Sequence, residues 1–353
     1  MPILALPARR PVSVAAVALA SVFAVGACTS AGAAGTAAPR TGSMSNAPAA
    51  SMAVSSAVAG TQIAGWPMPG TATTTSFIPV LASAENVVGS DRFLLTLVDR
   101  ENKPIASPDR QVTLKFFDLA KDPANPTQTI PTDFVWAIQG ERGFYVGSAD
   151  FASAGEWGVE VDVAQAGGPA SGQPGAQAST QPEAARIRFE VLQKGTTVAV
   201  GQPAPSVRTK TLSDVGGDVR LISTDTDPDP SLYTTSVADA LARHDPFVLA
   251  FATPAFCQSR VCGPTLDTVK KVKATEPGVT FINVEPYELV SKDGSLQPVL
   301  DASGQLTPVP AVDAYGLLVE PWLFVVGRDG IIHASFEAVV SEQELRAAID
   351  AVK

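Results

Sequence analysis

Cysteine and histidine are both scarce in this chain. Its 353 residues include three cysteines and two histidines. A structural zinc site needs four closely spaced Cys or His ligands, and no such spacing occurs. A phosphate-binding loop and a dinucleotide-binding fingerprint are also absent. We therefore expect no metal and no cofactor, and the few cysteines become the main candidates for chemistry.

Positive charge is also in short supply. The chain has 25 Lys and Arg against 35 Asp and Glu, a net charge of −10, and no basic run. Affinity for nucleic acid rests on clustered Lys and Arg. The sequence therefore predicts no nucleic-acid partner. The length exceeds that of one ordinary core and predicts two domains with tails.

The N-terminus has the pattern of an export signal. Arg9 and Arg10 precede an apolar run that ends at Cys28. The run is about 15 residues long, which fits a signal peptide and is shorter than the ~20 residues of a spanning helix. Its end, "VGAC", resembles a bacterial lipobox. The resemblance implies a signal peptide over 1–27, a diacylglycerol on the Cys28 thiol, and a lipid anchor on the extracytoplasmic face of the cell membrane. A plain secretory signal is the alternative.

The stretch 28–72 consists mostly of Ala, Ser, Gly, Thr and Pro and carries almost no charge. Such a segment cannot bury enough apolar surface to offset the entropy of ordering it. It predicts a disordered tether. With Cys28 lipidated, Cys257 and Cys262 are the two remaining thiols, an even number in an oxidising compartment.

The region 73–195 is predicted to form strands. Apolar and polar residues alternate, between Gly, Pro and Asp turns, over 91–100, 110–119, 143–151, 156–163 and 185–192. This pattern predicts an antiparallel β-sandwich, with Phe144 and Trp157 as core aromatics. The composition of 166–184 predicts a disordered loop.

The phrase "SAGEWGVEVDV" within this region resembles the immunoglobulin-like extracytoplasmic modules grouped with FixH, YtkA and CopC proteins. The copper-binding His and Met residues of CopC have no counterpart in this region. The resemblance therefore implies an immunoglobulin-like fold and no metal.

The region 198–353 alternates between strand and helix patterns. The nearly continuous apolar run "PFVLAFAT" (246–253) is typical of a buried strand in a parallel or mixed sheet. Helices are predicted over 235–245, 263–273 and 341–352, a strand over 278–286, and a hairpin over 321–337. Ser341 and Glu344 form a capping box at the start of the last helix.

This order, together with "VGQPAPSVRTK" and "YGLLVEPWLFVVGRDG", resembles the thioredoxin fold of TlpA/ResA-type thiol-disulfide proteins. The resemblance implies an α/β thioredoxin-like domain over 198–353. It makes Cys257 the attacking cysteine, at the N-terminus of a helix, and Cys262 the resolving one. It also makes Pro321 a cis-proline beside the disulfide. A thiol-disulfide oxidoreductase that acts on exported thiol or disulfide proteins is the implied activity.

The cysteine spacing departs from that family. Four residues separate Cys257 from Cys262, where two are usual. In a continuous helix the two Cα atoms would lie roughly 8–9 Å apart, and a disulfide needs about 7 Å or less. The pair therefore closes only if Cys257 precedes the helix or the first turn unwinds. The strand before the site also lacks the buried carboxylate that assists proton transfer in thioredoxins.

Three other roles for the pair stay open. The phrase "ATPAFCQSRVCG" resembles some peroxiredoxins, although Thr253 lies one residue too far from the cysteine and Pro321 takes the place of their arginine. Two thiolates and His333 make a possible Cu(I) ligand set, as in Sco-type proteins. The third role is a structural disulfide in a non-catalytic anchored adaptor. A structural disulfide adds most stability when it closes a long loop, and this loop is short.

Two acidic residues are expected to flank the cysteines. Glu285 lies near the end of the strand predicted over 278–286, and Glu320 directly precedes Pro321. A carboxylate beside a thiol disfavours the thiolate. We therefore expect Glu320 to raise the pKa of the thiols.

Overall fold

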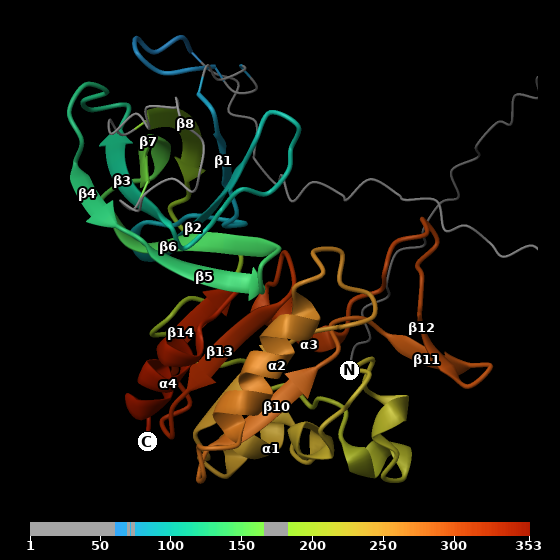
Figure 1. Ribbon diagram of the computed structural model, residues 1–353. Coiled ribbons are helices and arrows are strands. Elements are labelled where there is room, and N and C mark those ends of the chain that lie inside the picture. Colours follow the sequence, from blue (N-terminus) through green and yellow to red (C-terminus); the bar gives the residue numbers. More distant parts are fainter. Residues whose placement is uncertain (1–60, 69–70, 72–74, 166–182) are drawn as a thin grey trace, which may run out of the picture. The chain divides into compact units, whose positions relative to one another are not determined.

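The computed structural model of the chain describes residues 61–68, 71, 75–165 and 183–353 (Figure 1). Cys28 and the predicted signal peptide lie outside these residues, as do most of the predicted tether and of the predicted loop at 166–184. Within the described ranges, no helix is long and apolar enough to cross a membrane.

The first described domain is an antiparallel β-sandwich, as the alternating pattern predicts. One sheet has the order β1-β2-β6-β5 and the other the order β4-β3-β7-β8 (Figure 1). The sequence does not predict β1, β4 and β5, which are short. The strands are β1 (Ile78–Leu81), β2 (Gly89–Val98), β3 (Arg110–Asp118), β4 (Gln128–Pro131), β5 (Asp133–Ile138), β6 (Arg142–Phe151), β7 (Gly155–Gln165) and β8 (Glu183–Val191).

Aromatic side chains fill the space between the two sheets. Phe93 from one sheet and Phe116 from the other meet edge to face, with ring centroids 4.9 Å apart. Trp157 is buried in the same cluster, and its indole N–H donates to the Ser153 carbonyl at 2.9 Å. Phe144 is also buried, but in a separate apolar cluster outside this core. The prediction of core aromatics is therefore confirmed for both residues, although they belong to different apolar clusters.

The folded region begins before residue 73, where the sequence pattern places its start. Trp66 is buried against Phe117, and its indole N–H donates to the Pro123 carbonyl at 2.9 Å. The Arg186 guanidinium lies 4.8 Å from the centre of the Trp66 ring. Gly158 makes room for the ring, because a Cβ at that position would lie 2.3 Å from it. The described part of the predicted tether, 61–68, is thus packed on the sandwich.

The second domain contains a mixed four-stranded sheet of order β10-β9-β13-β14. Strand β9 (Phe247–Phe251) pairs in parallel with β10 (Thr280–Val284) and antiparallel with β13 (Trp322–Val326), which pairs with β14 (Ile332–Glu337). The predicted order of strand, helix, strand, hairpin and helix is present. The sequence does not predict the hairpin of β11 (Leu289–Lys292) and β12 (Ser295–Pro298), nor three short 3-10 helices, η1 (Leu212–Val215), η2 (Val219–Leu221) and η3 (Pro230–Tyr233).

Helices cover both faces of this sheet, which explains why β9 is entirely buried. Alternate residues of β9 point to opposite faces. Val248 and Ala250 pack with α2 (Cys262–Lys273) and α4 (Glu342–Asp350). Phe247 and Leu249 pack with α1 (Val237–Ala242) and α3 (Pro310–Tyr315), of which the sequence predicts only α1. The predicted capping box of Ser341 and Glu344 is present at the start of α4.

The sandwich packs against the second domain through the outer face of the sheet β1-β2-β6-β5. A strand in a sandwich usually has one face exposed to solvent, so that every second residue is buried. Here Phe93, Leu94 and Leu95 are all buried. Leu94 belongs, with Phe144, to a cluster that also contains residues of the second domain: Val261, Ala338 and Val339. The burial of three consecutive residues therefore indicates that both faces of β2 are covered.

Candidate functional site

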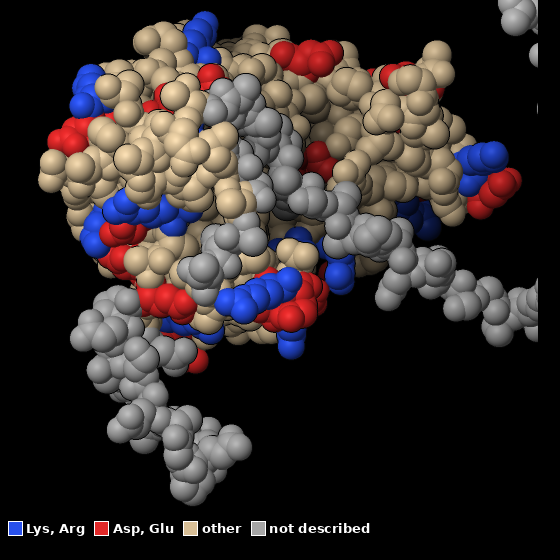
Figure 2. Space-filling view, turned by 90° about the horizontal axis from the view of Figure 1, so that it is seen from above, with Lys and Arg blue, Asp and Glu red and all other residues tan. Residues whose placement is uncertain are grey.

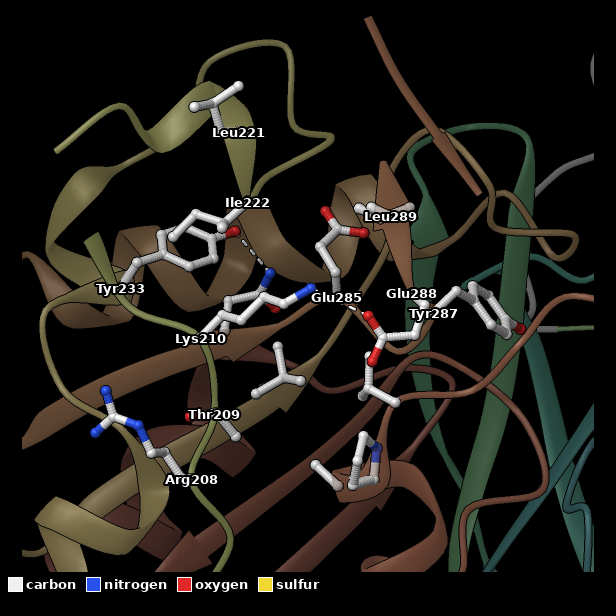
Figure 3. A pocket seen from close by; sticks show the side chains of 15 residues that line it. Arg208, Thr209, Lys210, Leu221, Ile222, Tyr233, Glu285, Tyr287, Glu288 and Leu289 are labelled. Carbon is white, nitrogen blue, oxygen red and sulfur yellow. Dashed lines mark hydrogen bonds and ion pairs between the residues drawn. The ribbon is translucent and has the colours of Figure 1, made fainter. Parts of the chain in front are cut away.

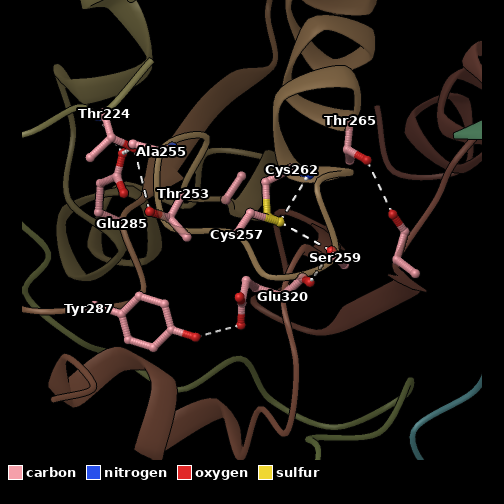
Figure 4. Close-up of a disulfide and its surroundings, with 12 residues drawn as sticks. Thr224, Thr253, Ala255, Cys257, Ser259, Cys262, Thr265, Glu285, Tyr287 and Glu320 are labelled. Atoms are coloured by element: carbon pink, nitrogen blue, oxygen red, sulfur yellow. Dashed lines mark hydrogen bonds between the residues drawn. A yellow bond between two sulfur atoms is a disulfide. The ribbon is translucent and has the colours of Figure 1, made fainter. Parts of the chain in front are cut away.

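Cys257 and Cys262 form a disulfide at the end of β9, with Cα atoms 6.0 Å apart (Figure 4). Helix α2 begins at Cys262, so Cys257 lies in the loop before the helix. This is one of the two arrangements that the spacing allows. The resemblance places the first cysteine at the helix N-terminus, whereas here the second one occupies that position. The chain reverses between them at Arg260, whose φ of 64° is in the left-handed region.

The two sulfurs differ in their surroundings. Cys262 is completely buried, whereas Cys257 is partly exposed. The backbone N–H of Cys262 donates to Cys257 Sγ at 3.3 Å, and Ser259 Oγ lies 3.1 Å from the same sulfur. N–H groups in the first turn of a helix have no partner within the helix and favour an anion. When the pair is reduced, this environment favours the thiolate of Cys257, the less buried of the two residues.

Pro321 lies next to this loop, and the Glu320–Pro321 peptide bond is cis. Ser259 Oγ, which contacts Cys257, also donates to the Glu320 carbonyl at 3.3 Å. The Ala338 N–H donates to the Pro321 carbonyl at 2.9 Å. The structure thus brings the three predicted site residues, Cys257, Cys262 and Pro321, to one place.

The Glu320 side chain is bonded to a tyrosine. Its carboxylate accepts from the Tyr287 hydroxyl at 2.7 Å, as Figure 4 shows. Burial raises the pKa of Glu320, and the bond from Tyr287 opposes that effect. The backbone carbonyl of Glu320 is the part that receives the bond from Ser259. The predicted effect of Glu320 on the thiols stays a prediction.

Glu285 is a buried carboxyl group close to the disulfide loop. It is 8% exposed and follows β10, the strand beside β9. Its Oε1 accepts from the N–H of Thr224 at 2.6 Å and from the Thr224 hydroxyl at 2.8 Å, and Thr224 Oγ1 accepts from the Ala255 N–H at 3.2 Å. Burial raises the pKa of Glu285 to about 7. The Glu285 carboxyl group thus lies at the end of β10 that adjoins the end of β9, since neighbouring parallel strands end at the same sheet edge.

Glu285 also lines a cavity of about 230 Å³ (Figure 3). The walls are largely apolar, with Tyr233 and Tyr287 among the lining side chains. Some polar groups there are paired: Lys210 Nζ lies 3.1 Å from Glu288, and Asn283 Nδ2 donates to the Tyr233 hydroxyl at 2.9 Å. Among the described residues, Asn283 Oδ1 and Glu285 Oε2 are buried with no hydrogen-bond partner. Sequence patterns give no signal for this cavity, because its lining comes from distant parts of the chain.

Both histidines contact groups other than the cysteines. His333 pairs with Asp329 at 3.2 Å, and His244 Nδ1 lies 3.2 Å from the Arg328 carbonyl. In the part of the chain that the structure describes, no three His, Cys, Asp or Glu side chains are grouped as metal ligands would be. The geometry therefore offers no observation in favour of the copper alternative.

The charged residues show no broad patch of one sign on the face seen in Figure 2. Acidic and basic side chains lie next to each other in small groups on a mostly uncharged surface. Among the described residues, Arg186 pairs with Glu160 at 2.7 Å.

Comparisons with known proteins give little guidance. No family model matches the chain, and no curated protein matches it. Similar solved structures include the soluble domain of PmoD from Methylocystis sp. ATCC 49242 (Rockwell), which is 16% identical over 31% of this chain and 79% of that chain, with a TM-score of 0.19. The Lin-41 filamin domain is 12% identical over 35% of this chain and 97% of that chain, also with a TM-score of 0.19. At these TM-scores neither likeness supports a conclusion about this chain.

Proposed function

We propose that the second domain is thioredoxin-like and exchanges disulfides with exported proteins through Cys257 and Cys262. In this proposal the sandwich is an immunoglobulin-like domain. A lipid on Cys28 holds the protein at the extracytoplasmic face of the membrane. The observation that carries the proposal is the asymmetry of the pair. Cys257 is partly exposed and its sulfur accepts from a helix N–H, whereas Cys262 is completely buried.

The reaction follows from this asymmetry. The Cys257 thiolate attacks one sulfur of a partner disulfide and forms a mixed disulfide, while the other partner sulfur leaves as a thiolate. Deprotonated Cys262 then attacks Cys257 Sγ. The second partner thiolate leaves, the partner is reduced by two electrons, and the Cys257–Cys262 pair is oxidised. The reverse sequence oxidises a partner dithiol.

The reduction potential of the pair tests the proposal. A value above about −270 mV supports exchange, and one below about −300 mV indicates a structural bond. Cys262→Ser should accumulate a mixed disulfide with exported proteins, because the resolving thiol is gone. Cys257→Ser is the matched control, since it removes the attacking sulfur. A low potential together with no trapped partner would favour the anchored adaptor.

The anchor is tested separately. Cys28→Ser should abolish incorporation of a labelled fatty acid and release the protein from the membrane fraction. Retention of the label in that variant would contradict the lipid anchor and leave the proposal for the cysteine pair untouched.

A further inference from the structure

The turn between β5 and β6 of the sandwich contacts the disulfide loop. Arg142, the first residue of β6, donates from Nη1 to the Ser259 carbonyl at 2.7 Å. The neighbouring Glu141 pairs with Arg260 at 3.3 Å, where both side chains are exposed. The first contact is a short charge-assisted hydrogen bond to the backbone of the loop, and such bonds are about twice as strong as neutral ones. The second is a surface ion pair, which contributes little.

Ser259 is the residue through which this contact reaches the disulfide. It is 6% exposed, and its hydroxyl contacts both Cys257 Sγ and the Glu320 carbonyl. Any movement of the Ser259 backbone therefore moves a group that touches the attacking sulfur. Arg142 holds that backbone from the sandwich side.

The next part of the loop is also held by the sandwich. Val261 is completely buried in the cluster that contains Phe144 and Leu94 of the sandwich. It directly precedes Cys262. The residues between the two cysteines are thus fixed at Ser259 by a hydrogen bond and at Val261 by burial, and both contacts come from the other domain.

We propose that Arg142 is a positioning residue for the Cys257–Cys262 disulfide, so that the sandwich tunes the redox equilibrium of a site in the other domain. This inference rests on the proposed function only for its biological use. A loop that is held in the closed conformation keeps the two sulfurs together, and the dithiol therefore closes more readily than in a free loop. Loss of Arg142 shifts the equilibrium toward the dithiol.

The test is a redox titration of the full chain against a dithiothreitol couple. We expect Arg142→Ala to lower the equilibrium constant for disulfide formation about tenfold, which raises the reduction potential by about 30 mV. Arg142→Lys keeps one charged donor and should recover part of the shift. Glu141→Ala is the matched control, since it removes the exposed ion pair from the same turn, and its potential should equal that of the wild type.

The outcome that overturns the inference is an unchanged potential in Arg142→Ala together with a lower Tm. Arg142 would then only hold the domains together. If Arg142→Ala does not fold, Arg142→Gln and Arg142→Lys supply the comparison. Equal reduction potentials in these two variants would also contradict the inference. The proposed function fails by a different result, namely no mixed disulfide with exported proteins, because the effect of Arg142 is a difference between variants and appears with or without a partner.

Discussion

Replacing Glu285 by glutamine should change how stability depends on pH. Burial raises the pKa of this carboxyl group from its ordinary value of 4.5 to about 7. The folded protein therefore binds the proton more tightly than the unfolded chain does. The resulting stabilisation is fully present below pH 4.5 and is lost as the pH rises through 7. The difference of about 2.5 in pKa corresponds to about 3 kcal/mol.

Glutamine is neutral at every pH and keeps an oxygen for the bonds from Thr224. Glu285→Gln should therefore remove this loss, so that the variant gains about 3 kcal/mol relative to the wild type between pH 4.5 and 8. Glu285 Oε2 is buried with no hydrogen-bond partner among the residues that the structure describes. An amide N–H₂ placed there costs the variant a constant amount of stability. The prediction therefore concerns the slope with pH and not the stability at one pH.

Urea unfolding of the oxidised protein at several pH values, followed by circular dichroism, measures this slope. Asp91 and Glu337 also have raised pKa values, about 6 and about 8, so the wild-type stability should fall over a wider range than Glu285 alone explains. The difference between variant and wild type isolates Glu285 if the three sites are independent. Glu288→Gln is the matched control beside the same cavity. Parallel curves for Glu285→Gln and the wild type would refute the reasoning.

Three further predictions concern the site and the packed N-terminal segment. Ser259→Ala removes the hydroxyl that lies 3.1 Å from Cys257 Sγ and that can donate to the thiolate once the disulfide is reduced. Loss of a hydrogen bond of about 1 kcal/mol should slow iodoacetamide alkylation of the reduced protein about fivefold at neutral pH; an equal rate would show that Ser259 serves only the Glu320 carbonyl. Glu320→Gln should speed the same alkylation, because it removes a buried negative charge near the loop, and an unchanged rate would remove Glu320 from the site. Trp66→Ala should lower the free energy of unfolding by about 3 kcal/mol in a urea titration, whereas a loss below 1 kcal/mol would mean that the segment 61–68 is not held on the sandwich.

The sequence predicts what local patterns determine. Alternation gives five strands of the sandwich, the apolar run gives β9, and the spacing of Leu266, Val269 and Val272 gives α2. The spacing of the cysteines also requires Cys257 to lie outside the helix or the first turn to unwind. These features depend on residues that are close together in the chain, where periodicity and bond geometry leave few choices.

The features that the sequence does not predict depend on distant residues. Trp66 stands in an Ala- and Ser-rich stretch, and only the space above Gly158 explains its burial. The sequence places Glu285 near the cysteines, but its hydrogen bonds to Thr224, 61 positions away, have no signal in the sequence. Arg142 has no motif, since its partner is a backbone carbonyl 117 positions along the chain.

The unusual cysteine spacing and the contact between the domains have one explanation. A thioredoxin-like pair usually has two residues between its cysteines, and here four residues form the loop. Three of the four contact the sandwich: the Ser259 carbonyl accepts from Arg142, Arg260 pairs with Glu141, and Val261 packs in the cluster that contains Phe144. In a two-residue loop, both residues lie between a loop cysteine and the first turn of the helix. Such a loop is too short to make these contacts. The added length therefore gives the disulfide its connection to the sandwich, and a potential that depends on Arg142 is the consequence that separates this explanation from a merely longer loop.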